Sequence, residues 1–276
     1  MTDSSHQIVI EAGRSERHYW RDLWSYRELF FFLAWRDILV RYKQTVIGIA
    51  WSVLRPLLTM VIFTIVFGIL AKLPSDGVPY PILVFAAMLP WHFFASAVAE
   101  GSNSLIQNAN IISKVYFPRI IVPVGAVVVS VVDLLISFAL MLALMVWYRF
   151  APGWHILAVP AFLALAVMVS IGLILWLAAL NVKYRDFRYI VPFLIQIGLL
   201  ISPVGFSSSI VPEQWRLLYS LNPMVGVIDG FRWSLLGGQV PLYVPGLALS
   251  VAIAALLLVS GIVYFRRTER SFADVI

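Results

Sequence analysis

Hydrophobic residues in this chain form long uninterrupted runs. Six runs are close to the length of about 20 residues that crosses a bilayer as a helix. They cover residues 56–71, 82–99, 120–147, 156–180, 190–206 and 243–265. The runs do not alternate with a period of two, and backbone groups inside hydrocarbon must be paired within the protein, so helices are favoured over a barrel. The pattern predicts an all-α integral membrane protein with six transmembrane helices.

Composition supports this class of protein. Of the 276 residues, 61% are hydrophobic and only 12% are charged, whereas about a quarter of a soluble domain is charged. The chain contains no cysteine, which excludes disulfides, thiolate metal sites and cysteine nucleophiles. A soluble globular fold is therefore excluded.

The basic residues predict the orientation. All but four of the 20 Lys and Arg residues fall in segments on one side of the predicted spans; the exceptions are Lys72, Arg149, Arg216 and Arg232. Positive charge accumulates on the cytoplasmic side of membrane proteins, so both termini are expected in the cytoplasm. The net charge of +6 then faces anionic lipid headgroups, and no nucleic-acid partner is expected.

Two segments precede the spans. Residues 1–22 are polar and are expected to form a cytoplasmic tail, and residues 23–46 to form an amphipathic interfacial helix, ahead of a six-span domain over 47–276. In that helix Phe31 and Trp35 lie opposite Asp37 and Arg41. The order of Asp37 and Arg41 predicts an ion pair four residues apart. A helix packed against the bundle is the alternative.

The segment 207–242 is external and unusually apolar. A run over 213–219 follows Pro212, and Asn222-Pro223 predicts the cap and first position of a second helix, which Gly237-Gly238 would end. Both helices are too short to span the membrane. They are expected to be re-entrant or interfacial and to lie at the outer mouth of a passage.

Catalytic chemistry is sparse. The G-x-x-x-x-G-K-[ST] loop that cradles nucleotide phosphates is absent, so ATP is not expected to bind this chain, and no catalytic, cofactor or metal residues are predicted. Asp133 is the single acid predicted deep in a span: it is either a relay or passage contact, or a helix-packing residue, and the second is favoured. Arg55 is either a snorkelling anchor or a phosphate contact at the entrance.

The segment 101–119 lies on the predicted cytoplasmic side. It carries apolar residues in polar surroundings, among them Leu105, Ile112, Val115 and Tyr116. This composition suits a short helix that docks into a groove of a partner. A helix resting on the bilayer surface is the alternative.

The order of several motifs resembles the membrane subunit of type-2 ABC exporters, in particular the polysaccharide-export permeases for O-antigen, capsule and teichoic acid. The resemblance covers nearly the whole chain after the tail. It rests on Trp35-Arg36-Asp37, Arg41-Tyr42, Gly48-Ile49-Ala50-Trp51, Pro56-Leu57, Leu89-Pro90-Trp91, Asn103-Ser104, Lys114-Val115-Tyr116-Phe117-Pro118, Asn181, Tyr184-Arg185-Asp186, Ser202-Pro203 and Leu221-Asn222-Pro223.

The resemblance implies a non-enzymatic subunit in the bacterial cytoplasmic (inner) membrane. It implies a homodimer that works with two separate P-loop ATPase subunits, which hold ATP and Mg, and lipid-linked glycan as the substrate. The coupling element would be 101–119, with Leu105, Ile112, Lys114, Val115 and Tyr116 at the contact. The translocation path would be bordered by Phe63, Phe67, Gln196, Trp215 and Tyr219, and the cytoplasmic entrance by Arg36, Arg41 and Arg55.

Other functions fit the residues less well. An intramembrane enzyme would need convergent carboxylates, His or Lys at the membrane face, where the spans offer Asp133 alone. An ion-coupled carrier would show paired repeats and several buried charges. A type-2 ABC exporter of drugs or small lipids is the alternative to glycan export.

Overall fold

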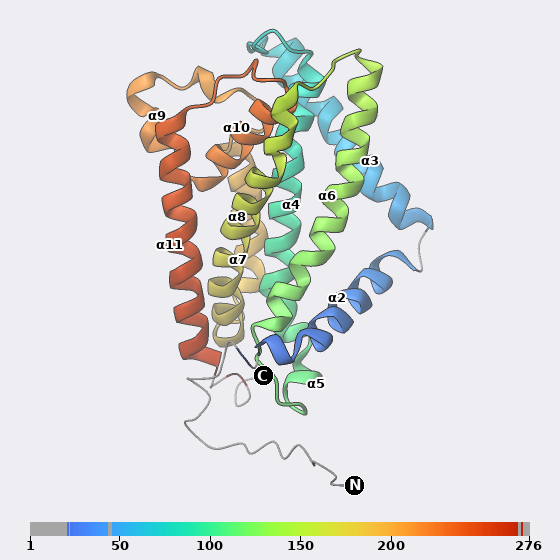
Figure 1. The fold of residues 1–276 in the computed structure, drawn as a ribbon, viewed down its shortest axis with the longest axis vertical. Coiled ribbons are helices and arrows are strands. Elements are labelled where there is room, and N and C mark those ends of the chain that lie inside the picture. Colours follow the sequence, from blue (N-terminus) through green and yellow to red (C-terminus); the bar gives the residue numbers. More distant parts are fainter. Residues whose placement is uncertain (1–20, 22, 44–45, 270–271, 273–276) are drawn as a thin grey trace.

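The computed structural model describes residues 21, 23–43, 46–269 and 272, and every regular element among them is helical. Most of the predicted tail, 1–22, lies outside the described residues. Long helices stand side by side in an upright bundle, and α2 slopes across its lower half (Figure 1). The start of α2, the short helix α5 and the end of α11 lie at the same end of the bundle.

The helices follow one another with short connections. They are α2 (Arg27–Tyr42), α3 (Val46–Phe63), η1 (Thr64–Leu70), α4 (Tyr80–Gln107), α5 (Ala109–Ile112), α6 (Ile121–Trp147), η2 (Trp154–Ala158), α7 (Val159–Lys183), α8 (Phe187–Ile201), η3 (Ser208–Ile210), α9 (Glu213–Tyr219), α10 (Pro223–Leu235) and α11 (Val244–Thr268). The element η1 is a π-helical continuation of α3.

Five helices in the described part are long and apolar enough to cross a membrane. They are Val53–Leu70, Tyr80–Gln107, Ile121–Trp147, Trp154–Lys183 and Val244–Thr268. The predicted run 190–206 forms a shorter helix, α8, with 15 residues. The helix ends at Ile201. The backbone of the next residue, Ser202, is extended, because Pro203 disfavours helical geometry at the residue before it.

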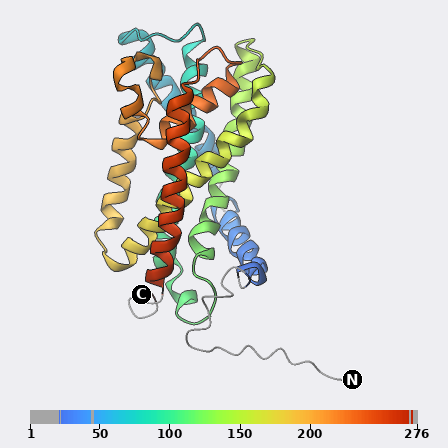
Figure 2. The ribbon, with the colours of Figure 1, turned by 60° about the vertical axis from the view of Figure 1, so that its left-hand side comes forward.

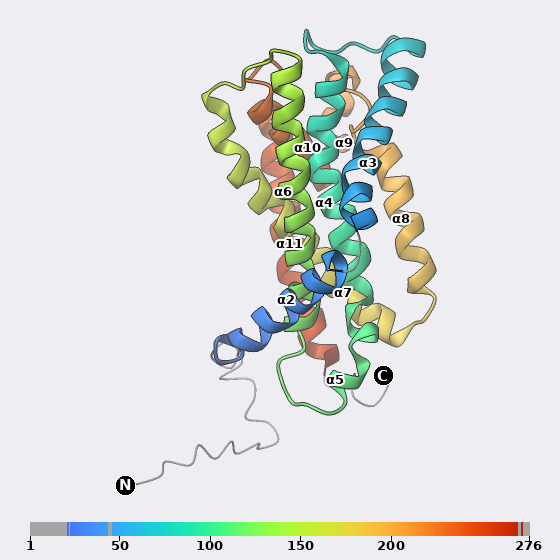
Figure 3. The same ribbon diagram turned by 90° about the vertical axis from the view of Figure 1, so that its right-hand side faces the viewer.

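Helix α4 is the centre of the bundle. It packs against α6, α7 and α10, and its side chains from Ile82 to Trp91 are almost all buried. By contrast α3 and α8 lie beside α4 at the edge of the bundle (Figure 3). Both helices, and η1 at the end of α3, keep broad apolar faces exposed, including Leu58, Ile62, Ile69, Phe193 and Leu200.

Helices α7 and α11 are in backbone contact. A Cβ atom on Gly172 would lie 2.7 Å from the backbone of Leu257 and Leu258, and one on Gly261 would lie 2.5 Å from the carbonyl oxygen of Gly172. Glycine is therefore required for this close approach. Figure 2 shows α11 running the length of the bundle, with α10 crossing near its upper end.

The two short helices predicted in 207–242 are confirmed as α9 and α10. The side chain of Asn222 caps α10 by accepting a hydrogen bond from the backbone N–H of Met224, and Pro223 is the first helical residue. After the helix, Gly237 and Gly238 adopt positive φ of 63° and 79°, a conformation that glycine adopts at little cost.

Helix α2 packs against the bundle through one face and leaves another face exposed. Leu33 and Ala34 are buried, and α2 packs on α6, whereas Phe31, Phe32 and Trp35 are exposed. The predicted ion pair between Asp37 and Arg41 is wrong. Asp37 pairs with Arg36, and Arg41 pairs with Asp133.

Candidate functional site

A large cavity opens into the side of the bundle at the level where α2 meets α3. This side cavity has a volume of about 680 Å³ and is bounded by α2, α3, α4, α6 and α8. Its lining combines charged residues with aromatic and apolar ones: Arg41, Tyr42, Arg55, Pro56, Leu89, Trp91, His92, Phe93, Ala95, Ser96, Ala99, Glu100, Asp133, Leu134, Ser137, Pro192, Ile195, Gln196 and Leu199. The arrangement suits a ligand that is charged at one part and apolar at another.

Asp133 connects α2 to α6 at the wall of the side cavity. Its Oδ2 lies 2.8 Å from the Nη2 of Arg41, and its Oδ1 accepts a hydrogen bond from the hydroxyl of Tyr42. Burial and then the contact with Asp133 raise the pKa of Tyr42, while Arg41 acts in the opposite direction. Tyr42 therefore remains a protonated donor. These partners support the packing interpretation of Asp133 over a relay.

The three residues predicted at the entrance do not all meet. Arg41 and Arg55 both line the side cavity. Arg36 instead donates to Asp37 at 2.7 Å and to the side-chain oxygen of Asn108 at 2.8 Å. It therefore ties α2 to the end of α4 and pairs with Asp37.

His92 is a further polar residue of the side cavity. It lines the side cavity together with Arg55, and its Nε2 is buried without a hydrogen-bond partner. A buried polar nitrogen without a partner is unusual, because such groups normally find a hydrogen bond. His92 is therefore a further candidate contact for a polar ligand.

The residues predicted along the path are spread over the height of the bundle. Gln196 lines the side cavity. Phe63 and Phe67 touch edge to face, with ring centroids 5.4 Å apart, and Phe67 packs so closely on Gly205 that a Cβ there would lie 2.6 Å from its ring. Trp215 is exposed.

Tyr219 lies farther from the side cavity. Its hydroxyl donates to the carbonyl of Ile201 at 2.8 Å, and the residue borders a separate, smaller cavity at the end of the bundle opposite α5. Burial, followed by the charge of Asp229, raises its pKa. Tyr219 therefore stays a hydrogen-bond donor.

The residues predicted at the coupling element fall into two groups. Leu105 and Ile112 are buried in a cluster with Phe117, Phe265 and Phe272. The exposed members are Lys114, Val115 and Tyr116. The first group stabilises the segment, and the second is accessible to a partner.

Two buried charged residues in α10 were not expected from the sequence. Arg232 was assigned to the outer surface, but its side chain is fully buried and donates to the backbone carbonyls of Leu83, Phe206 and Val204 at 3.2, 2.7 and 3.0 Å. Asp229, one turn earlier, is 5% exposed. Asp229 is thus a second acid withdrawn from solvent, and it lies outside the six predicted spans.

Residues 28–236 match the ABC-2 type transporter family. Because this match covers well over half of the chain, the protein belongs to that family of transporter membrane subunits.

Relatives agree over almost the full length. The chain is 28% identical over 259 residues to the O-antigen export system permease protein RfbA of Myxococcus xanthus, which covers 93% of this chain and 98% of that protein. Two proteins of the same description from Klebsiella pneumoniae are each 25% identical, over 87% of this chain and 92% of each relative. The resemblance to polysaccharide-export permeases inferred from the motifs is confirmed.

Proposed function

We propose that this chain is the permease subunit of an ATP-driven exporter that moves lipid-linked polysaccharide, of the O-antigen type, outward across the bacterial cytoplasmic membrane. The single observation that carries the proposal is the side cavity. It brings the guanidinium groups of Arg41 and Arg55 together with Trp91 and Phe93. Guanidinium groups bind phosphate oxygens, and aromatic rings offer flat apolar faces to sugars and lipid.

The proposed working unit is a homodimer with two P-loop ATPase subunits. The exposed apolar faces of α3 and α8 support a second copy beside them, because a symmetric pair would enclose a path between the same helices of both chains. Phe63, Phe67 and Gln196 would border that path, with Trp215 at its outer mouth.

Coupling to the ATPase is assigned to the exposed part of the cytoplasmic segment 101–119. Lys114, Val115 and Tyr116 are accessible there, and they follow directly on a buried cluster that would transmit movement to α4 and α11. ATP and Mg are assigned to the partner subunit, since this chain lacks the phosphate-binding loop.

The proposed topology has six spans and cytoplasmic termini. Helix α8 would be the fifth span, with its apolar residues continued by the turn that ends in Phe206. Helix α2 would lie in the cytoplasmic leaflet through its exposed aromatic face. A reporter that is active only in the periplasm should work when inserted near Ser75 and should be silent after Ile276, which lies outside the described residues. The reverse result would refute the topology.

The proposed substrate is tested by export after replacement of Arg55. In cells that depend on this permease, Arg55→Gln should lower surface glycan by about tenfold, the effect of losing one interaction of about 1.4 kcal/mol with a charged group. Lipid-linked polymer should then accumulate on the cytoplasmic side. Arg185→Gln, a change at an exposed arginine between α7 and α8, is the matched control.

Two outcomes would contradict the proposal. Normal export by Arg55→Gln would remove the side cavity from the route. Transport of small drugs or lipids by the purified complex, with lipid-linked glycan left untouched, would favour the alternative exporter class.

A further inference from the structure

A second, smaller cavity lies at the opposite end of the bundle from α5. This outer cavity has a volume of about 120 Å³, well above the roughly 10–15 Å³ that one water molecule needs. It is enclosed by η3, α9, the first turns of α10 and the segment 240–243. None of the residues assigned to entrance or coupling contributes to it.

Asp229 is an unusual group in the wall of the outer cavity. The residue is only 5% exposed, and its Oδ1 has no hydrogen-bond partner. The Ser208 side chain acts on the carboxylate and lowers its pKa, against the larger effect of burial. An unpaired buried carboxylate oxygen is costly, so the fold retains an acceptor there that a bound donor would satisfy.

The charges around Asp229 restrict what can bind. Arg216 and Arg232 both act on the carboxylate, as does Asp76 with the opposite sign. Arg216 also lines the outer cavity, where it donates to the carbonyls of Val211 and Ser209 at 3.0 Å. The guanidinium groups disfavour a cation, and the carboxylates disfavour an anion. A neutral ligand with hydroxyl donors fits both conditions.

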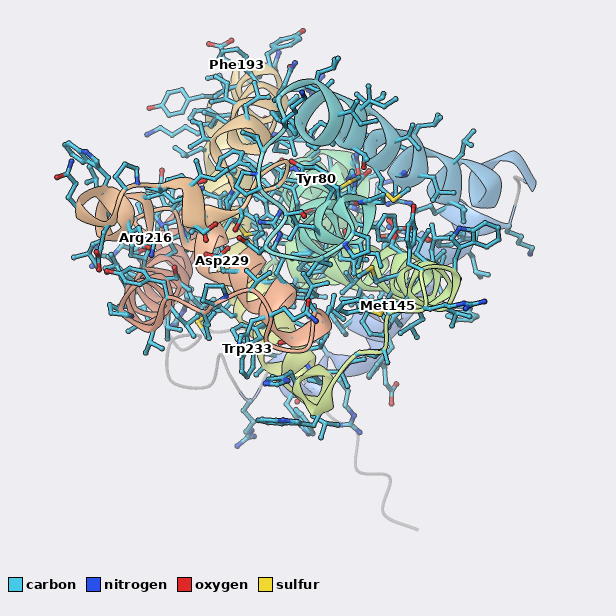
Figure 4. The ribbon with its side chains drawn as sticks, turned by 90° about the horizontal axis from the view of Figure 1, so that it is seen from above. Tyr80, Met145, Phe193, Arg216, Asp229 and Trp233 are labelled. Atoms are coloured by element: carbon cyan, nitrogen blue, oxygen red, sulfur yellow. The ribbon has the colours of Figure 1, made fainter. Side chains whose placement is uncertain are left out.

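The remaining wall suits such a ligand. The cavity is lined by Tyr219 and Tyr243 and by the hydroxyl groups of Ser207, Ser208 and Ser209. Figure 4 shows Asp229 beside Arg216 at this end of the bundle. Aromatic side chains combine an apolar body with a polar tip, and serine hydroxyls both donate and accept.

We propose that the outer cavity is a binding subsite for one sugar ring, with Asp229 accepting hydrogen bonds from the ring hydroxyls. The ligand class follows from the lining and charges of the cavity. That the ring belongs to a polysaccharide leaving the transporter rests on the proposed function. The subsite would hold the emerging glycan on the outer side and oppose its return.

The absence of cysteine from the chain provides a direct test. Ser208→Cys places one thiol at the cavity wall, and its alkylation by a membrane-impermeant maleimide is measured on the intact permease–ATPase complex. The probes are the methyl glycosides of glucose, galactose and mannose at high millimolar concentration. Gln214→Cys, on the exposed side of α9, is the control.

At least one glycoside should slow the alkylation of Ser208→Cys several-fold and leave Gln214→Cys unchanged. The protection should be lost in Ser208→Cys combined with Asp229→Asn. If that variant does not fold, Tyr243→Leu, which removes a ring from the wall, should abolish the protection instead. Equal rates with and without all three glycosides would overturn the proposal. Protection by sodium chloride or inorganic phosphate in place of the glycosides would do so as well.

A further arm identifies the source of the sugar and separates this site from the export function. Membranes that contain the lipid-linked polymer and are given ATP should protect Ser208→Cys without added glycoside, whereas membranes lacking the polymer should not. Protection by glycosides without export would retain the subsite and refute the proposed function. Export without any protection of Ser208→Cys would retain the function and refute the subsite.

Discussion

Replacing Arg232 should loosen the half of the bundle that contains α10. This arginine joins α10 to α4 through the carbonyl of Leu83 and to the turn after α8 through Val204 and Phe206. Arg232→Met keeps much of the length and apolar volume of the side chain and removes all three donors. The change therefore removes the hydrogen bonds together with the positive charge that acts on Asp229, at nearly constant volume.

The size of the effect follows from the acceptors. Leu83 lies within α4, whereas Val204 and Phe206 lie in a non-helical turn. A buried acceptor left without a partner costs about 1–3 kcal/mol, and the bond to Phe206 is only partly buried, so we expect a total of about 3 kcal/mol. In a chain of this size about 1 kcal/mol corresponds to ~2–4 °C in Tm. The expected loss in Tm is thus ~6–12 °C.

The assay is the fraction of detergent-solubilised protein that stays monodisperse by size exclusion after heating. Arg232→Lys should fall between wild type and Arg232→Met, because an ammonium group lacks the planar fork that reaches three carbonyls. Arg185→Met is the control for loss of an exposed charge. If Arg232→Met melts within error of wild type, the three bonds do not hold α10 in place.

Three further predictions address the other charged and exposed groups. Asp133→Asn should keep most export, because Asn still accepts from Tyr42 and the lost ion pair with the partly exposed Arg41 is worth about 1 kcal/mol or less; complete loss at normal protein level would show a charge-dependent role. Val115→Asp should lower copurification of the ATPase and leave membrane insertion intact, and unchanged copurification would exclude docking at this exposed residue. Burial raises the pKa of Asp229 to about 6 from 3.8. Ionisation of Asp229 therefore destabilises the folded state: the cost is absent below about pH 4, grows between about pH 4 and 6, and is complete above about pH 6. The Tm advantage of Asp229→Asn over wild type should therefore shrink as the pH falls from neutral to about 5. A Tm difference that does not change with pH would show that folding does not raise the pKa of Asp229.

Local sequence rules predicted much of the fold. Five of the six apolar runs form helices of spanning length, because helix formation in an apolar run depends on residues close in sequence. The boundaries of α10 were predicted from Asn222-Pro223 and Gly237-Gly238 for the same reason. The end of α8 was placed too late, because the apolar residues continue past Ser202 although the helix does not.

Features that depend on contacts between residues far apart in the sequence could not be predicted from local sequence patterns. Arg232 reads as a surface charge in a short amphipathic helix, and only the carbonyls of Leu83, Val204 and Phe206 make its burial possible. Asp37 and Arg41 have ideal spacing, yet Arg36 and Asp133 compete for them. Leu105 and Ile112 were expected at a partner surface but lie in the core of the same chain.

The glycine contact between α7 and α11 bears on how these two helices are able to move. With Gly172 against the backbone of Leu257, and Gly261 against Gly172, the two helices cannot slide past each other without side-chain atoms meeting backbone. The two helices are therefore expected to move as one rigid unit. Helices α3 and α8 contact the bundle along one side. Force from a partner would therefore change the distance between α3 and α11 while the distance between α7 and α11 stays constant.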